Sequence, residues 1–250
     1  MTRRLFVPPA SLAAGALALG GEDHRYLARV LRVRAGDELV LFDGAGREAR
    51  ARIARVELAL VHVVVEEAHR PADDERALRP ITLLAAILKG DRTDLVVQKA
   101  TELGVARIVP ICGERSIVRL DEARARSRHA RWEKVAREAA RQCGRADSPV
   151  IDPAVTLAVA TLAAAAPADA LRLVLHERAR SHPLRTALTP PPDAGVVFAT
   201  GPEGGWSNAE VDAAVTAGFL AVGLGPRVLR AETAAIAGMA ILAYALGALD

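Results

Sequence analysis

The 250-residue sequence has only two cysteines, and 3% of its residues are aromatic. Cys112 and Cys143 form no CxxC pair, and no group of Cys and His has the spacing of a zinc site. We therefore expect two reduced thiols and no bound metal. With so few aromatic rings, the 51% of hydrophobic residues must build a core mainly of Ala, Val, Leu and Ile.

Neither end of the 250-residue sequence shows the pattern of a signal peptide or of a membrane span. The first residues, MTRRLFVPPA, carry charge but no continuous apolar region, so they do not form a signal peptide. Residues 231–246 are apolar, but they are rich in Ala and Gly and include Glu232. This composition favours a helix in the core or at an interface over a membrane span. We expect a cytoplasmic protein without a membrane partner.

The common nucleotide and hydrolase motifs are also missing. No glycine-rich loop continues into Gly-Lys-Ser/Thr, so there is no Walker A site. No GxGxxG opens a βαβ unit, which disfavours an ordinary Rossmann enzyme. A Ser-His-Asp order with a nucleophile elbow is not present either.

The first seventy residues are predicted to be rich in strands. Residues 37–43 end at Asp43-Gly44, a hairpin signal, and residues 62–66 form a short β-branched run. Between them, residues 48–56 alternate apolar side chains with arginines. The alternation predicts a small sheet or barrel with one apolar face and one arginine face.

The segment at 70–80 (RPADDERALRP) is polar and flanked by prolines, which is typical of a linker. The pattern of hydrophobic residues changes after it. Apolar runs alternate with helical patterns, which predicts an α/β domain whose mostly parallel sheet is covered on both faces. We therefore divide the chain into residues 1–70, a linker at 71–79 and residues 80–250. The predicted strands are 81–88, 107–111, 171–175, 196–199 and 220–224, and the predicted helices are 91–103, 128–143, a stretch after Thr156, 208–217 and 232–246.

Basic residues concentrate between Arg115 and Arg145, where ten Arg or Lys oppose four Asp or Glu, a local charge of +6. Such a block suits a polyanion such as nucleic acid, but it is equally compatible with a solvated helix face in an arginine-rich chain. The other face of helix 128–143 is predicted to be core. Its members at helical spacing are Trp132, Val135, Ala136, Ala139, Ala140 and Cys143.

Three loops follow predicted strands of the second domain, where parallel sheets bind their ligands. They are 175–177, 200–205 and 223–230, and two of them are rich in glycine, which lets the backbone approach a ligand closely. One such loop could be only a tight turn. Two such loops after neighbouring strands, both with charged residues, favour a nucleotide-type site. Its walls would be residues 200–208 and 223–234.

The motif GPEGGWS at 201–207, together with LGPRVLRAETA at 224–234, resembles the paired signature of the SPOUT (knotted) RNA methyltransferases. More narrowly, the chain resembles the ribosomal RNA small subunit methyltransferase E family. The narrower resemblance rests on MTRRLFVPP, His24 with Val30-Leu31-Arg32, LKGDRTDLVVQKATELGV at 88–105, Glu114-Arg115-Ser116 and EAARQCGR at 138–145. It extends over nearly the whole chain, and the one departure is Trp206, where Phe or Leu is more familiar.

The resemblance implies a small N-terminal PUA-like RNA-binding domain and a C-terminal α/β domain tied into a trefoil knot. It also implies a homodimer that uses S-adenosylmethionine to methylate N3 of a uridine in the 16S rRNA of the small ribosomal subunit, without a metal and without DNA as a partner. The expected cofactor-binding residues are Leu175, His176, Glu177, Thr200, Gly201, Pro202, Glu203, Gly204, Gly205, Leu224, Gly225, Val228 and Leu229.

Arg230 and Glu232 are the expected catalytic residues. Uridine N3 is mostly protonated at neutral pH, so the reaction needs a base or stabilisation of the uridine anion. Arg230 would stabilise charge on the uracil carbonyls, and Glu232 would accept the proton or orient Arg230. Two alternatives stay open: Glu232 only caps the last helix, or it pairs with Arg230 and the pair only holds the loop.

N3 lies on the Watson–Crick edge of uridine, so a paired or stacked uridine must be exposed before it can react. RNA binding is expected to use arginines and lysines, because these side chains contact the phosphates. The candidates are Arg3, Arg4, Lys89, Arg92, Arg115, Arg141 and Arg145. Two rival functions remain: a SPOUT enzyme with another target, such as the ribose 2′-oxygen, and a non-catalytic RNA-binding ribosome-assembly factor. The intact GPEGG and LRAETA motifs disfavour the second rival.

Overall fold

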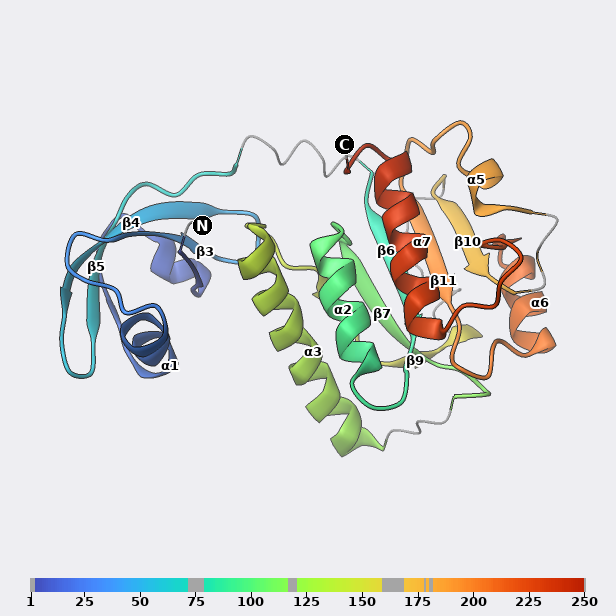
Figure 1. The fold of residues 1–250 in the computed structure, drawn as a ribbon, viewed down its shortest axis with the longest axis horizontal. Coiled ribbons are helices and arrows are strands. Elements are labelled where there is room, and N and C mark those ends of the chain that lie inside the picture. Colours follow the sequence, from blue (N-terminus) through green and yellow to red (C-terminus); the bar gives the residue numbers. More distant parts are fainter. Residues whose placement is uncertain are drawn as a thin grey trace. The chain divides into compact units, whose positions relative to one another are not determined.

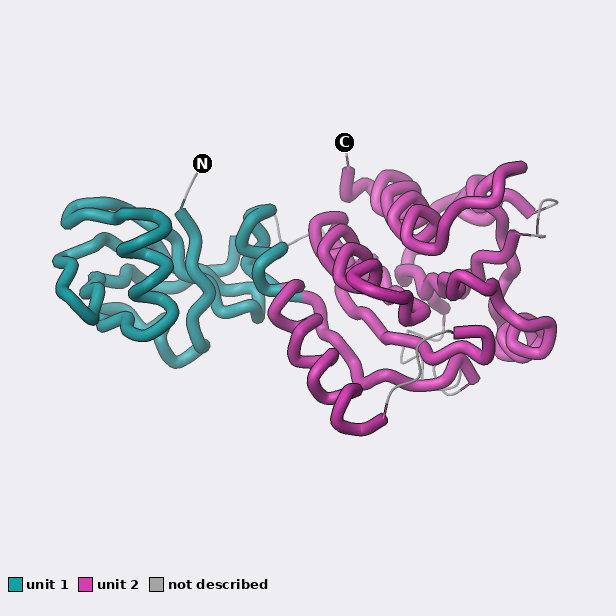
Figure 2. Tube along the Cα trace, turned by 60° about the horizontal axis from the view of Figure 1, so that its bottom comes forward, with its two compact units in different colours: residues 1–74, 137–148 teal, residues 75–136, 149–250 magenta. Residues whose placement is uncertain are grey.

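The computed structural model describes residues 3–71, 79–116, 121–158, 169–177, 179 and 182–249. The chain forms two compact units (Figure 2). Unit 1 comprises residues 1–74 and 137–148, and unit 2 comprises residues 75–136 and 149–250. Most of the linker predicted at 71–79 and most of the helix predicted after Thr156 lie outside the described residues, so both stay predictions.

Unit 1 is built on a five-stranded sheet in the order β1-β3-β4-β5-β2 (Figure 1). Only the β1–β3 pair is parallel. The strands are β1 (Arg4–Phe6), β2 (Gly15–Leu19), β3 (Glu38–Phe42), β4 (Glu48–Val56) and β5 (Val61–Val65). Along β4, Ala49, Ala51 and Ile53 are buried while Arg50 and Arg52 are exposed. The predicted apolar and arginine faces are therefore confirmed for this strand.

Short helices complete unit 1. They are the 3₁₀ turn η1 (Pro9–Leu12), α1 (Gly21–Arg25) and the π-helical turn η2 (Tyr26–Val30) that continues it. Leu12 and Leu27 join the core that the sheet forms. No sequence pattern predicted these helices or strands β1 and β2.

The turn between β3 and β4 is stabilised by Asp43, whose side chain is fully buried. Its Oδ1 accepts hydrogen bonds from the backbone N–H groups of Ala45 and Arg47, and its Oδ2 accepts one from the Arg47 guanidinium. Burial opposes ionisation of this carboxyl, but the hydrogen bonds and the Arg47 charge outweigh it and lower its pKa. The predicted Asp43-Gly44 turn is confirmed, although the connection from Phe42 to Glu48 is longer than a two-residue hairpin.

Unit 2 contains a parallel sheet in the order β12-β10-β11-β6-β7-β8, with β9 also paired to β7. This confirms the predicted α/β class. Its strands are β6 (Ile81–Ala86), β7 (Arg107–Cys112), β8 (Val150–Ile151), β9 (Val155–Thr156), β10 (Leu171–Leu175), β11 (Val196–Thr200) and β12 (Leu220–Val222).

Both faces of this sheet are covered, which explains why its strands are apolar at nearly every position. Alternate residues of β6 and β11 contribute to different cores. Leu83 and Phe198 pack with helices α2 (Arg92–Glu102) and α7 (Ala231–Ala245), whereas Leu84 and Val197 pack with α6 (Asn208–Thr216). Helices α2 and α7 run side by side over the first face (Figure 1).

The other helices of unit 2 are α5 (Leu184–Ala187) and most of α3 (Glu122–Cys143), whose residues from 137 onward belong to unit 1. Helix α3 begins six residues before the predicted start at Arg128. Trp132, Ala136, Ala139 and Ala140 are buried as predicted. The prediction was wrong for Cys143, which is exposed because it lies in the last turn of the helix.

Helix α7 is a core helix on one side. Gly238 lies so close to Phe198 that a Cβ there would come within 2.4 Å of the ring. Ile241 and Tyr244 on its other side are exposed. Within the described residues, no helix is long and apolar enough to cross a membrane. The trefoil knot implied by the resemblance stays a prediction.

Candidate functional site

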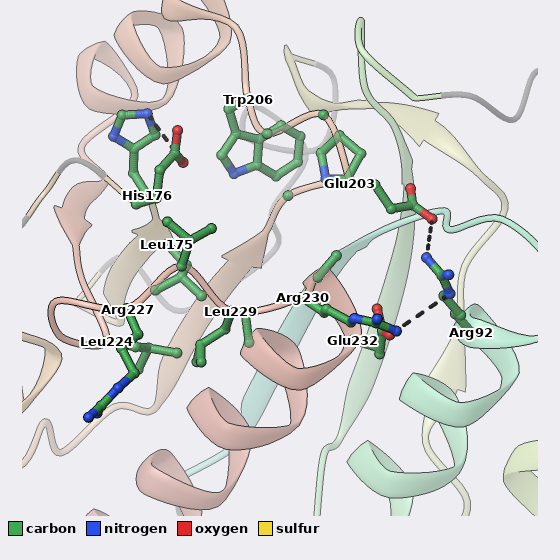
Figure 3. Close-up of a pocket in the computed structure, with 18 of the residues that line it drawn as sticks. Arg92, Leu175, His176, Glu203, Trp206, Leu224, Arg227, Leu229, Arg230 and Glu232 are labelled. Atoms are coloured by element: carbon green, nitrogen blue, oxygen red, sulfur yellow. Dashed lines mark hydrogen bonds and ion pairs between the residues drawn. The ribbon is translucent and has the colours of Figure 1, made fainter.

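A cavity of about 540 Å³ lies beyond the carboxyl ends of β10, β11 and β12 (Figure 3). It is formed by three strand-end loops and the first turns of α2 and α7. The described residues that line it are Arg92, Leu175, His176, Glu177, Gly201, Pro202, Glu203, Gly204, Gly205, Trp206, Leu224, Gly225, Arg227, Val228, Leu229, Arg230, Ala231, Glu232 and Ala234.

The structure thus brings together the expected cofactor-binding residues except Thr200. That residue is the last of β11, is 3% exposed and does not line the cavity. Trp206 and Arg227 also line the cavity; both lie within the walls predicted at 200–208 and 223–234, but they were not among the expected cofactor-binding residues. Arg92 was expected to bind RNA and was not placed in the cavity, because its position in the sequence is remote from both motifs.

The loop after β11, residues 201–207 (the β11 loop), is held by its own side chains. Glu203 Oε1 accepts a hydrogen bond from the backbone N–H of Lys89 at 2.9 Å and lies 3.3 Å from Arg92 Nη1. Trp206 is 2% exposed, and its ring lies against Gly201. Ser207 is the N-cap of α6 and forms a capping box with Glu210, a reciprocal pair of hydrogen bonds.

The loop after β12, residues 223–230 (the β12 loop), is held differently. Gly223 exchanges backbone hydrogen bonds with His182 and Leu184 at its start. From 224 to 229, the described structure has no hydrogen bond made by these residues. Gly225 has φ +112°, which favours glycine, and Val228 is 76% exposed.

The third wall is the end of β10. Leu175 is half-buried and faces the cavity, and the His176 ring lies 3.8 Å from the Glu177 carboxylate (Figure 3). A Cβ at Gly205 would come 3.7 Å from the same carboxylate. The Glu177 side chain therefore lies next to Gly205 of the β11 loop.

Arg230 is the residue that precedes α7, and Glu232 lies in the first turn of that helix. Glu232 lies 3.8 Å from Arg92 Nε, and Arg92 also pairs with Glu203. Among the described residues Arg230 has no ion pair, so an Arg230–Glu232 pair does not hold this loop. Glu232 makes no side-chain capping bond, although its carboxylate suits the helix dipole there.

Three buried polar atoms of the cavity residues have no hydrogen-bond partner among the described residues. They are Glu203 Oε2, Trp206 Nε1 and Glu232 Oε2. Leaving buried polar groups unpaired costs free energy, so such atoms indicate a site built for a polar ligand. Within the described part of the chain, no group of His, Cys, Asp and Glu could hold a metal ion.

The candidate RNA-binding residues of unit 1 have partners within the unit. Arg3 pairs with Asp37 at 2.8 Å. Arg4 pairs with Glu48 at 2.9 Å and donates to the carbonyl of Arg145. Arg145 pairs with Asp147, and Arg141 contacts both Glu138 and the Tyr26 ring.

Two of the three candidates in unit 2 have fewer partners within the protein than those of unit 1. Lys89 and Arg115 are exposed, and neither side chain has an ion pair among the described residues. The Arg115 guanidinium makes one hydrogen bond, to the carbonyl of Trp206 at 3.4 Å. The structure therefore places two exposed cations on loops that adjoin the β11 loop.

Two family models match the chain. Residues 74–243 match an RNA methyltransferase domain, and residues 19–66 match an RNA methyltransferase PUA domain. The second match confirms the expected PUA-like N-terminal domain. The PUA match ends at residue 66, before the polar segment at 70–80, and the RNA methyltransferase match begins at residue 74, inside it.

Curated relatives match over almost the full chain. The ribosomal RNA small subunit methyltransferase E of Mycobacterium bovis is 35% identical, with 99% of this chain and 91% of that protein covered. The protein of the same name from Synechocystis is 32% identical, with 96% and 77% covered. The one from Bacillus subtilis is 30% identical, with 92% and 91% covered.

Solved structures show the same fold. A protein of Legionella pneumophila, solved with bound cofactor S-adenosylmethionine, has a TM-score of 0.86 and 34% identity, with 98% of both chains covered. The ribosomal RNA small subunit methyltransferase E of Neisseria gonorrhoeae, solved with S-adenosylmethionine, has a TM-score of 0.84 and 34% identity, with 97% of both covered. With matches of this extent to its models, its curated relatives and its solved structures, the chain belongs to the ribosomal RNA small subunit methyltransferase E family.

Proposed function

We propose that this protein transfers a methyl group from S-adenosylmethionine to the 16S rRNA of the small ribosomal subunit. One observation carries the proposal: the GPEGG motif after β11 and the LRAETA motif after β12, two strands separated in the sheet by β10, line a single cavity, to which LRAETA contributes Arg230 and Glu232. Family membership supports the same activity. Two solved relatives contain S-adenosylmethionine, which supports the choice of cofactor.

The cavity residues fit this cofactor. A volume of about 540 Å³ lies within the range of roughly 300–1,000 Å³ that is usual for small-molecule sites. Leu175, Leu224 and Leu229 provide apolar contacts for an adenine ring, and the backbone of 224–229 offers N–H and C=O groups that make no hydrogen bond to a described residue. When bound, the cofactor supplies an electrophilic methyl group.

We further propose that the acceptor is N3 of a uridine. Its proton must leave, and we propose Glu232 as the acceptor; the support is that Glu232 Oε2 is buried and has no hydrogen-bond partner among the described residues. Arg92, 3.8 Å from Glu232 Oε1, holds that carboxylate in position. Arg230, which has no ion pair among the described residues, stabilises the negative charge that develops on the uracil carbonyl oxygens.

RNA phosphates are proposed to contact the exposed cations near the cavity, Lys89 and Arg115, with Arg92 at its edge. Arg3, Arg4, Arg141 and Arg145 are retained as candidates. Their internal partners mean that contacting phosphate would require them to share or exchange a carboxylate. We therefore expect single substitutions beside the cavity to weaken RNA binding more than substitutions in unit 1.

A homodimer is also proposed. Leu95 of α2 and Ile241 and Tyr244 of α7 are exposed by 39%, 40% and 71%, on helices that lie side by side. Large apolar side chains gathered in this way are typical of protein interfaces. Light scattering of the purified protein tests the proposal, and a monomeric mass at micromolar concentration would refute it.

The decisive experiment maps methylated nucleotides in 16S rRNA from cells with and without the gene, and in RNA treated with the purified protein. An N3-methyl group blocks the Watson–Crick edge and stops reverse transcription, whereas a ribose 2′-O-methyl group leaves that edge free. Protein-dependent stops at one uridine are expected. Ribose methylation would refute the N3 assignment, and no methylation together with no binding of S-adenosylhomocysteine would refute the proposed function as a whole.

A further inference from the structure

Glu210 is a buried carboxylate that does not line the cavity. It lies in the first turn of α6, and the residue is 9% exposed. One of its oxygens, Oε2, accepts the backbone N–H of Ser207 at 2.8 Å and completes the helix cap. The other, Oε1, accepts the backbone N–H of Glu114 at 2.9 Å. A helix cap needs only the first of these bonds, so the second requires a separate explanation.

The second bond reaches the loop that follows β7, residues 113–116 (the β7 loop). Two glycines allow this loop to lie directly against the β11 loop. A Cβ at Gly113 would come 3.3 Å from Glu210 Oε1 and from the Trp206 ring. A Cβ at Gly204 would come 3.1 Å from the Cβ and carbonyl oxygen of Arg115. The contact is therefore made by backbone at close approach, and Glu210 is the carboxylate that joins the two loops.

Arg115 is the exposed cation of the β7 loop. Its guanidinium reaches back to the carbonyl of Trp206, a cavity residue. Ser116 closes the loop, because its hydroxyl accepts the N–H of Gly113 at 3.0 Å. Among the described residues, the hydrogen bonds that join the β7 loop to the β11 loop and α6 are the bond from Arg115 to Trp206 and the bond from Glu114 to Glu210.

We propose that Glu210 is a positioning residue for RNA binding, which holds the β7 loop against the β11 loop and so places Arg115 beside the cavity. This inference rests on the proposed function, because it assumes that Arg115 contacts RNA. It assigns a role in substrate binding to an acidic side chain that touches neither substrate nor cofactor.

The sign of the expected effect separates positioning from simple electrostatics. Glu210→Gln removes a negative charge near a polyanion, which by Coulomb's law alone would strengthen RNA binding. Positioning predicts the reverse. The glutamine side chain has one carbonyl acceptor, and its NH₂ group would face one of the two backbone N–H donors, so one of the two bonds is lost.

The test is a double-mutant cycle in the full-length protein, with dissociation constants measured for 16S rRNA and for S-adenosylhomocysteine. We expect Glu210→Gln to weaken RNA binding about fivefold, as for the loss of one phosphate contact, and to leave S-adenosylhomocysteine affinity within about twofold. Arg115→Ala should give a similar loss, and the double variant should bind no more weakly than Arg115→Ala alone, because both act through one contact.

Two matched controls accompany the cycle. Asp212→Asn removes the same charge from an exposed position of α6 and should not weaken RNA binding. Ser207→Ala removes only the hydroxyl that accepts the Glu210 N–H, and it leaves the bond to Glu114 in place. It should lower stability, as loss of a cap does, without weakening RNA binding.

Amide hydrogen exchange at Glu114 provides a readout that is independent of RNA. Exchange should accelerate in Glu210→Gln and not in Ser207→Ala. Additive losses in the cycle, tighter RNA binding by Glu210→Gln, or unchanged exchange at Glu114 would each overturn the positioning role. If the wild-type protein binds neither RNA nor S-adenosylhomocysteine while Glu114 responds as expected, the proposed function has failed and the loop contact still stands.

Discussion

The β11 loop and the β12 loop line the same cavity, yet they are held in opposite ways. In the β11 loop, Glu203 bonds the neighbouring backbone at Lys89, Trp206 is buried, and Ser207 begins a helix with a reciprocal cap. In the β12 loop, residues 224–229 make no hydrogen bond within the described structure, and Val228 is exposed.

The difference indicates that the two loops have different roles in the site. The β11 loop is organised by protein contacts alone, so its shape does not depend on a ligand. The β12 loop has backbone N–H and C=O groups that no described residue bonds, and such groups are available to bond a ligand. We therefore expect substitutions in the β11 loop to lower stability and substitutions in the β12 loop to lower ligand binding or turnover.

The largest expected effect is on stability, from Trp206→Ala. Removing a large buried side chain leaves a cavity, and we expect the free energy of unfolding to fall by about 3–5 kcal/mol. Chemical denaturation followed by circular dichroism measures it. Trp206→Phe keeps most of the volume and should lose clearly less. A loss below about 1 kcal/mol for Trp206→Ala would contradict the view that the β11 loop is part of the core.

The next effect is on catalysis, from Arg230→Ala at the end of the β12 loop. Loss of a group that stabilises developing charge should lower methyl transfer about 100-fold. Affinity for S-adenosylhomocysteine and the unfolding midpoint should change little, because Arg230 has no ion pair among the described residues. Glu232→Gln tests the proposed proton acceptor in the same assay. Normal transfer rates in both variants would show that the catalytic assignment is wrong.

A smaller effect should appear in hydrogen exchange without any substitution. The amides of residues 224, 225 and 227–229 should exchange quickly in the free protein and slow about tenfold or more when S-adenosylhomocysteine binds. The amides of Gly205 and Glu210, which are hydrogen-bonded already, should be protected in both states. Equal protection of the two loops in the free protein would remove the proposed distinction between them.

The smallest effect is expected from Val228→Ala. Val228 is exposed in the free protein but lines the cavity, so its methyl groups should become buried only against a ligand. Losing them should weaken S-adenosylhomocysteine binding about fourfold to tenfold at unchanged stability. Val215→Ala, at a 51% exposed position of α6 outside the cavity, is the matched control and should bind normally.

Much of the parallel sheet could be predicted from the sequence, because strands buried on both faces are apolar at almost every position. The strands β1 and β2 could not. Arg4–Phe6 is three residues long, and Gly15–Leu19 reads GALAL, without a β-branched residue. Both become strands only through pairing with β3 and β5, and that pairing is a tertiary effect that local propensity does not contain.

The candidate site was predictable where it consists of continuous loops and not where it depends on distant contacts. The motifs at 201–207 and 224–234 identified two walls directly. The position of Arg92 between Glu203 and Glu232 required the fold, since α2 and α7 are adjacent only in space. The bond from Glu210 to Glu114 likewise joins residues 96 positions apart.

The parallel sheet of unit 2 also ends in its shortest strands. Strand β12 at one edge has three residues, and β8 at the other has two. An exposed edge presents unpaired backbone groups to other molecules, and long flat edges promote aggregation. Edges this short offer few such groups. The longer, almost entirely apolar strands of this sheet therefore all lie inside it, and its two edges leave few backbone groups with which another chain could pair.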